Sequence, residues 1–100
     1  IFACDTFDGI PTDDQFVENK RGKGMFSDAQ IEEISKKIEI FGVKKEIELI
    51  KGNFDDSLER LESEKFSLVF LDCNVYDSAK IAINFSYPKL SFVKHSFEII

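Results

Sequence analysis

The sequence has no tryptophan, two prolines, two cysteines and one histidine among its 100 residues. Two cysteines, Cys4 and Cys73, are too few for a disulfide framework, and we expect both to be reduced thiols. The lone His95 has no partner at metal-ligand spacing, which argues against a histidine-based zinc site. No apolar run approaches the roughly 20 residues that a membrane-spanning helix needs. With no signal-peptide pattern at Ile1, these absences favour a cytoplasmic location and no membrane partner.

Positive charge is also scarce. Lysine and arginine together number 13 against 19 acidic residues, for a net charge of −6. Nucleic acids and anionic membranes are bound through positive surfaces, so we expect neither as a partner. Hydrophobic residues make up 43% of the chain and phenylalanine is abundant, with eleven copies. This composition is typical of one small globular domain with a Phe/Ile/Leu-rich core.

Strands are predicted at three apolar runs that end in polar residues. They cover Ile1–Cys4, Glu46–Lys51 and Phe66–Leu71, and the tail Ser91–Ile100 is a fourth, weaker pattern. Because the chain opens inside the first of these strands without an initiating methionine, we expect it to be an excerpt of a longer protein. A long loop is predicted over residues 6–26, and loops of that length tend to be functional lids or disordered.

The first predicted helix begins at Ser27, where Gln30 completes a capping box, and ends at Gly42. Its expected core face is formed by apolar residues at helical spacing, namely Ile31, Ile34, Ile38 and Phe41.

Two further helices follow the later strands. Asp55 and Asp56 favour the start of a short helix that carries Leu58 and Leu61. A third helix is expected to be capped by Asp77 or Ser78, to run through Ile81 and Phe85, and to end at Pro88. Alternating strands and helices indicate the α/β class with a parallel sheet.

Each predicted strand is followed by polar residues. They are Asp5, then Gly52 and Asn53, then Asp72, Cys73 and Asn74. The carboxyl ends of parallel strands meet at one edge of the sheet, where ligands bind in open α/β folds. The pattern therefore predicts a ligand cleft at this edge.

Two readings are open for each acidic position. Asp5 could accept hydrogen bonds from two ribose hydroxyls, or could simply stabilise the turn that follows the strand. Asp72, with Asn74 and Asp77, offers oxygen ligands suited to Mg²⁺ or Ca²⁺, although solvated acids at strand ends are common.

Three motifs, taken in order, resemble the macrocin O-methyltransferase family. They are FACDTFDGIP at Phe2–Pro11, KGNFDDSL at Lys51–Leu58 and LDCNVYDS at Leu71–Ser78, and the resemblance covers residues 1 to about 90. Members of that family are class I enzymes that use S-adenosyl-L-methionine to methylate sugar hydroxyls of natural products and glycans. The resemblance implies a Rossmann-like, three-layer α/β methyltransferase fold with a mostly parallel sheet. It is truncated here, because the first strand with its glycine-rich loop is absent.

The resemblance also implies roles for individual residues. Asp5 and Thr6 would bind the cofactor ribose, and Gly52, Asn53 and Phe54 would lie beside the adenine. Asp72 would be a ligand of a catalytic Mg²⁺. Asn74 stands where the family has an acid that deprotonates the acceptor, and an amide has no useful basicity. The late Asp-Asp-Tyr that completes the family's metal site is missing from residues 91–100.

The sequence therefore predicts part of a sugar O-methyltransferase, with a small sugar-containing substrate and no turnover by this stretch alone. A homo-oligomer is left open. The alternative is a degenerate, non-catalytic α/β module for subunit contacts or ligand sensing. A receiver-like signalling domain is a weaker third reading, because Lys94 does not fit the lysine position that such a domain requires. Exposed apolar strand edges predict marginal stability and aggregation.

Overall fold

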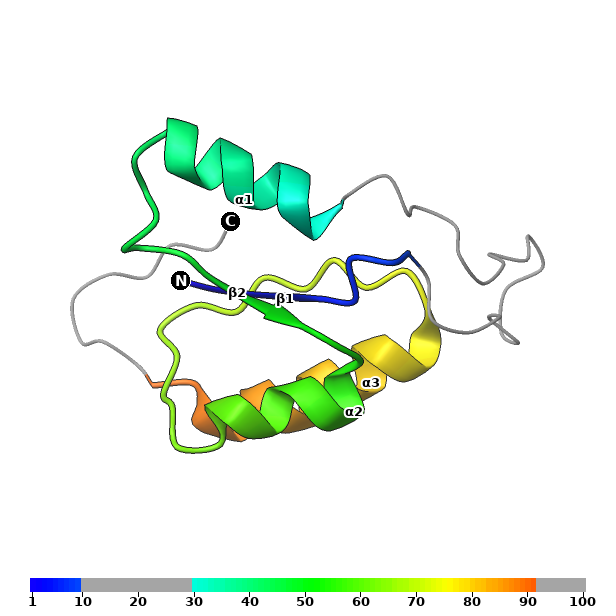
Figure 1. The fold of residues 1–100 in the computed structure, drawn as a ribbon. Helices are drawn as coiled ribbons and strands as arrows, with labels where there is room; N and C mark the ends of the chain where they lie inside the picture. The colour runs from blue at the N-terminus through cyan, green and yellow to red at the C-terminus, as the bar shows by residue number, and fades with distance from the viewer. Residues whose placement is uncertain (10–29, 92–100) are drawn as a thin grey trace.

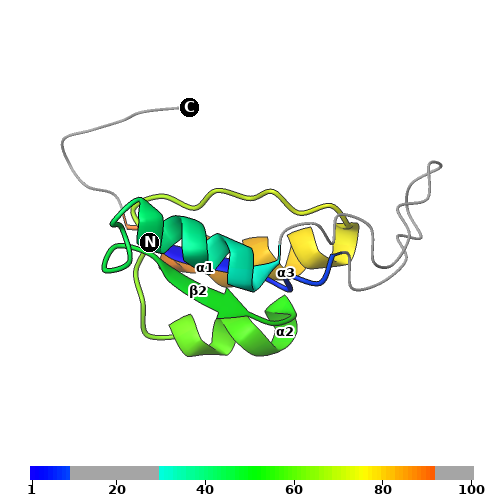
Figure 2. The same cartoon turned by 45° about the horizontal axis from the view of Figure 1, so that its top comes forward.

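In the computed structural model, which describes residues 1–9 and 30–91, two short parallel strands lie between helices (Figure 1). Strands β1 (Phe2–Asp5) and β2 (Glu48–Lys51) pair with Phe2 opposite Glu48 and Asp5 opposite Lys51. Helix α1 (Ile31–Ile40) lies on one side of them, as both views show (Figures 1 and 2). The other side carries α2 (Phe54–Ser57), its 3-10 continuation η1 (Leu58–Leu61) and α3 (Tyr76–Ser86). A 3-10 turn, η2 (Tyr87–Lys89), follows α3.

Two of the predicted strands are confirmed, with slightly shifted bounds. On β2, Ile50 is fully buried while Leu49, on the opposite face, is half-buried. Because successive side chains of a strand point to opposite faces, β2 receives cover from both helical layers. The fold is thus a small α/β arrangement with a parallel sheet, as predicted for its class.

The third predicted strand, Phe66–Leu71, is wrong. Among the described residues, only Phe66 of this run pairs, in a single parallel bridge with Leu90, and residues 67–73 have no regular secondary structure. Leu68 and Phe70 are 73% and 86% exposed. Strand formation depends on a neighbouring strand more than on local propensity, and no described strand pairs with this segment.

The edge of β1 that faces away from β2 is likewise unpaired among the described residues. The carbonyls of Ile1 and Asp5 accept hydrogen bonds from Glu48 and Gly52, at 2.9 and 3.0 Å. Alternate residues of a strand direct their backbone groups to the same neighbour, so Phe2 and Cys4 direct theirs to the open edge. Within the described ranges, an apolar strand edge and the apolar segment 67–73 are therefore both left without strand partners.

Helix α1 is confirmed, although its predicted start at Ser27 lies outside the described residues. The described helix begins at Ile31 and ends before Gly42, whose φ of +69° is the left-handed conformation expected of a helix stop. Three of the predicted core-face residues are half-buried, but Phe41 is 76% exposed. The stripe is incompletely covered because a two-stranded sheet offers it little surface.

The helices on the other side are confirmed in position. Leu58 and Leu61 are buried, as predicted. Helix α3 begins at Tyr76 after the buried Val75, so the prediction that Asp77 or Ser78 caps it is wrong. The buried Val75 is the N-cap residue, so the helix begins before Asp77 and Ser78, the polar residues that the sequence favoured as its cap.

The core is small. Its buried hydrophobic residues on the described part of the chain are Phe7, Ile50, Leu58, Leu61, Val75 and Ala82. None of the helices in the described ranges has the length and apolar character needed to cross a membrane. Of the predicted loop over residues 6–26, only residues 6–9 are described, and most of the predicted tail strand, residues 92–100, lies outside the described ranges.

Gly52→Ala is expected to destabilise the chain by about 2–3 kcal/mol. Gly52 has a φ of +145°, and a Cβ there would lie 3.2 Å from the Ser57 Cβ. Gly42→Ala is the matched control, because its φ is also positive but no atom lies within 4 Å of an added Cβ. Its cost is expected to be about 1 kcal/mol. Urea unfolding followed by circular dichroism compares the two, and an equal or larger loss for Gly42→Ala would contradict the crowding at Gly52.

Candidate functional site

The carboxyl ends of β1 and β2 lie side by side. The Gly52 N–H donates to the Asp5 carbonyl at 3.0 Å, one step beyond the last pair of the two strands. Asp5 and Gly52, which the sequence placed at one edge of the sheet, are therefore neighbours in the structure.

The Asp5 carboxylate stabilises the turn that follows β1. Its Oδ1 accepts a hydrogen bond from the Phe7 N–H at 2.8 Å, so the reading of Asp5 as a turn residue is confirmed. No described residue bonds to Oδ2, and the residue is exposed. A carboxylate can accept hydrogen bonds at both oxygens. Asp5 can thus hold the turn with one oxygen and bind a ligand hydroxyl with the other.

The turn itself is held by its own side chains. The Thr6 hydroxyl donates to the Gly9 carbonyl at 2.7 Å and accepts from the Asp8 N–H at 3.3 Å. Phe7 has a φ of +56° and is 5% exposed. A bulky residue in the left-handed region is strained, and such strain persists only where the surroundings hold it. The buried Phe7 ring therefore anchors the turn at the end of β1.

An ion pair that sequence reasoning missed spans the same edge. Lys51 Nζ lies 3.2 Å from Asp8 Oδ1 and joins the end of β2 to the turn after β1. The available signal was the Asp-Thr-Phe-Asp-Gly run, which is typical of a side-chain-stabilised turn. Its partner on β2 could not be read from that run, because the pairing depends on strand register.

The residues after β2 form the start of α2. Asn53 is the N-cap residue, and its carbonyl accepts from the Ser57 N–H at 2.8 Å, while its side chain makes no cap hydrogen bond. The Ser57 hydroxyl donates to the Gly52 carbonyl at 3.4 Å. Phe54 lines the groove between α2–η1 and α3. Its predicted place beside an adenine stays a prediction.

The third polar group, Asp72, Cys73 and Asn74, lies at the end of the segment 67–73. Asp72 and Asn74 are exposed, and Cys73 is half-buried. Burial raises the pKa of the Cys73 thiol, and the negative charges of Asp72 and Asp5 raise it further. Because such charge effects weaken with distance, this link between Asp5 and Cys73 indicates that the end of β1 and the end of the segment lie near each other.

The predicted magnesium site is not supported by the described residues. Among them, no group of three or more His, Cys, Asp or Glu side chains is arranged to hold a metal ion. Mg²⁺ requires near-octahedral oxygen coordination, to which Asp72 and Asn74 offer two side chains. The described residues therefore supply too few donors to hold the ion by themselves.

Alkylation of Cys73 by iodoacetamide is expected to be slow at pH 8 and to accelerate in Asp72→Asn. The raised pKa lowers the thiolate fraction, and removal of the Asp72 charge lowers the pKa again. Asp77→Asn is the matched control, since Asp77 is not among the causes of the shift. Peptide mass spectrometry separates Cys73 from Cys4. Equal rates in the two variants would contradict the electrostatic link.

Comparison with known proteins identifies the family. The family model described as Macrocin-O-methyltransferase (TylF) matches residues 1–98. Neither the curated proteins nor the solved structures include a match to this chain. Since the family model spans nearly the whole sequence, including all the site positions described above, the chain belongs to the macrocin-O-methyltransferase (TylF) family.

Proposed function

We propose that this chain is the cofactor-binding part of an S-adenosyl-L-methionine-dependent methyltransferase that methylates a sugar hydroxyl. The observation that carries the proposal is the family match over residues 1–98. It is supported by Asp5 at the end of β1, whose Oδ2 accepts no hydrogen bond from a described residue. Location in the cytoplasm and action on a small sugar-containing substrate belong to the same proposal.

The complete fold that we propose is the Rossmann-like, three-layer methyltransferase fold. Its support is the parallel β1–β2 pair with helices on both sides, together with the open edge of β1. A first strand lying between β1 and the segment 67–73 explains why the outer edge of β1 and this segment both lack a strand partner among the described residues. In this arrangement the segment becomes a sheet strand once that neighbour is present.

The residues at the strand ends fit the cofactor. Asp5 Oδ2 accepts from the ribose hydroxyls, while Thr6, whose hydroxyl bonds to Gly9, keeps the turn in place. Gly52 lies beside the backbone of Asp5, and its positive φ, which glycine tolerates, sets the turn from β2 into α2. Asn53 contributes exposed amide groups at the same point.

The bound cofactor supplies an electrophilic methyl group on a sulfonium. The chain's own contribution is to hold the acceptor hydroxyl in line with that group, which is the main source of rate in such a transfer. The Asn74 side-chain carbonyl accepts a hydrogen bond from the hydroxyl and orients it, but does not take the proton. The proton passes to a carboxylate, for which the exposed Asp72 is the neighbouring candidate.

A non-catalytic module is the second candidate, and Asn74 is the observation that favours it. The position at which the family resemblance implies a base carries an amide here. A domain that binds the cofactor without transferring its methyl group could serve ligand sensing or subunit contacts.

Asn74→Asp separates the two functions. In the complete reading frame, we expect this variant to raise methyl transfer to a sugar-bearing acceptor at least 10-fold, because a positioned general base contributes about 10²–10⁴-fold. Asn53→Asp is the matched control and is expected to give no gain. Product is quantified by mass spectrometry. Cofactor binding without transfer in either variant would favour the non-catalytic module.

A further inference from the structure

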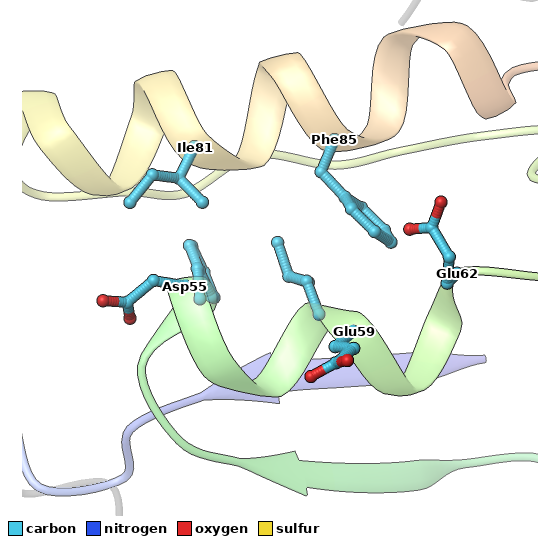
Figure 3. A pocket seen from close by; sticks show the side chains of 7 residues that line it. Asp55, Glu59, Glu62, Ile81 and Phe85 are labelled. Atoms are coloured by element: carbon cyan, nitrogen blue, oxygen red, sulfur yellow. The ribbon is translucent and has the colours of Figure 1, made fainter.

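A groove runs between α2–η1 and α3 on the side of the sheet away from α1. Its volume is about 410 Å³, and its walls are apolar, with Phe54 and Leu58 on one side and Ile81 and Phe85 on the other. Figure 3 shows Ile81 and Phe85 projecting from α3 toward α2–η1. A groove between two helices is a shape into which a third helix can pack.

The rim of the groove on α2–η1 is acidic. Asp55, Glu59 and Glu62 follow one another at spacings of four and three residues and lie along this wall. All three are exposed. The groove therefore combines apolar walls with a row of negative charge.

One end of the groove shows which chemical group it accepts. The ammonium of Lys89 lies 3.1 Å from Glu62 Oε1 and 4.8 Å from the centroid of the Phe85 ring. Only 14% of the Lys89 side chain is exposed, although lysine is normally solvated. Its aliphatic stem and its charge are thus both accommodated, by the apolar wall and by the carboxylate.

Along the rest of the groove, carboxylates again lie beside apolar side chains, but no cation of the described residues pairs with them. Asp55 and Glu59 have no ion-pair partner in the described part of the chain, although Ile81 and Leu58 lie beside them. The other ion pairs of the described residues involve Glu33, Asp8 and Glu48, all away from the groove. In the described part of the chain, Asp55 and Glu59 thus combine an acidic side chain with an apolar wall, as Glu62 does, but pair with no cation.

We propose that this groove binds an amphipathic, basic helix of a partner protein. The apolar face of that helix packs on Leu58, Ile81 and Phe85. Lysine or arginine side chains spaced four residues apart, as Asp55 and Glu59 are, pair with these two carboxylates. Each of these basic side chains of the partner helix then lies on the apolar wall and pairs with a carboxylate, as the Lys89 side chain does with Glu62.

A labelled peptide of about 18 residues tests the proposal. It is built of leucine, alanine and lysine, with one leucine stripe flanked by lysines at a four-residue spacing. Its control has the same composition in scrambled order. Fluorescence anisotropy at physiological salt measures binding to the full chain, and we expect the patterned peptide to bind and the scrambled one to bind at least several-fold more weakly.

Matched variants then locate the site. Asp55→Asn/Glu59→Gln is expected to weaken binding roughly 3- to 10-fold, since each exposed ion pair contributes modestly. Glu32→Gln/Glu39→Gln makes the same change in net charge on α1 and is expected to leave binding unchanged. Equal losses in both variants, or equal binding of the two peptides, would overturn the proposal. The peptide comparison uses the unaltered protein, so it decides the matter even where a variant unfolds.

Discussion

Ile50→Ala is expected to unfold most of the chain at room temperature. Ile50 is the one fully buried large side chain of the described residues, at 0% exposure on β2. Truncation of a buried isoleucine costs about 2–5 kcal/mol, because the lost contacts leave a cavity. A core of this size supplies only about 3–5 kcal/mol of net stability. The free-energy cost of this one substitution is therefore comparable to the total free energy of unfolding of the chain.

Urea unfolding followed by circular dichroism measures this effect. Ile40→Ala makes the same chemical change at a side chain that is 78% exposed, and is expected to shift stability by less than about 0.5 kcal/mol. The unaltered chain is itself expected to be marginally stable, with Leu68 and Phe70 promoting aggregation. A cooperative transition at high temperature, retained in Ile50→Ala, would show that the account of the core is wrong.

Asp5→Asn is expected to weaken S-adenosyl-L-methionine binding roughly 100-fold in the complete reading frame, because hydrogen bonds to a charged group contribute about 1.5–3 kcal/mol each. An asparagine oxygen can still accept from the Phe7 N–H, so the turn after β1 is retained. The loss of cofactor affinity is therefore attributable to Asp5 Oδ2 and to the negative charge of the carboxylate, rather than to unfolding of the turn.

Asp8→Asn is the control for that prediction. Asp8 lies in the same turn and carries the same charge, but it pairs with Lys51. The exposed ion pair contributes little, and binding is expected to change less than about threefold. Similar losses in the two variants would mean that the charge of the turn, and not the position of Asp5, governs affinity.

Local patterns predicted the local parts of this structure well. The apolar run before Asp5, the stop at Gly42 and the helix that buries Leu58 and Leu61 are encoded within a few residues of themselves. Each depends on backbone conformation and on nearby turn chemistry. These elements could be predicted without knowing which other segments of the chain pack against them.

Apart from the cap of α3, where Val75 stands in place of the predicted Asp77 or Ser78, the failures concern contacts between distant parts of the chain. The segment at Phe66–Leu71 has the composition of a strand but no described neighbour to pair with. The ion pair between Lys51 and Asp8 joins residues 43 positions apart, and that between Lys89 and Glu62 joins residues 27 apart. Strand register and helix packing place these groups together, and neither is visible in a short motif.

In the candidate site, too, one prediction was confirmed and another was not supported. Asp5 and Gly52 are neighbours, as predicted from the common edge of parallel strands. The end of the segment at Asp72 is linked to them by the effect of the Asp5 charge on Cys73. The metal site was expected from the residue types and from the family resemblance, and the described residues do not assemble its ligands.

Calorimetric titration with S-adenosyl-L-methionine tests the central claim most directly. The titration uses the complete reading frame that contains this chain. The account predicts saturable binding with a stoichiometry of one, abolished by competition with S-adenosylhomocysteine and weakened in Asp5→Asn. Absence of binding heat at millimolar cofactor, from a protein shown to be folded by circular dichroism, would contradict it.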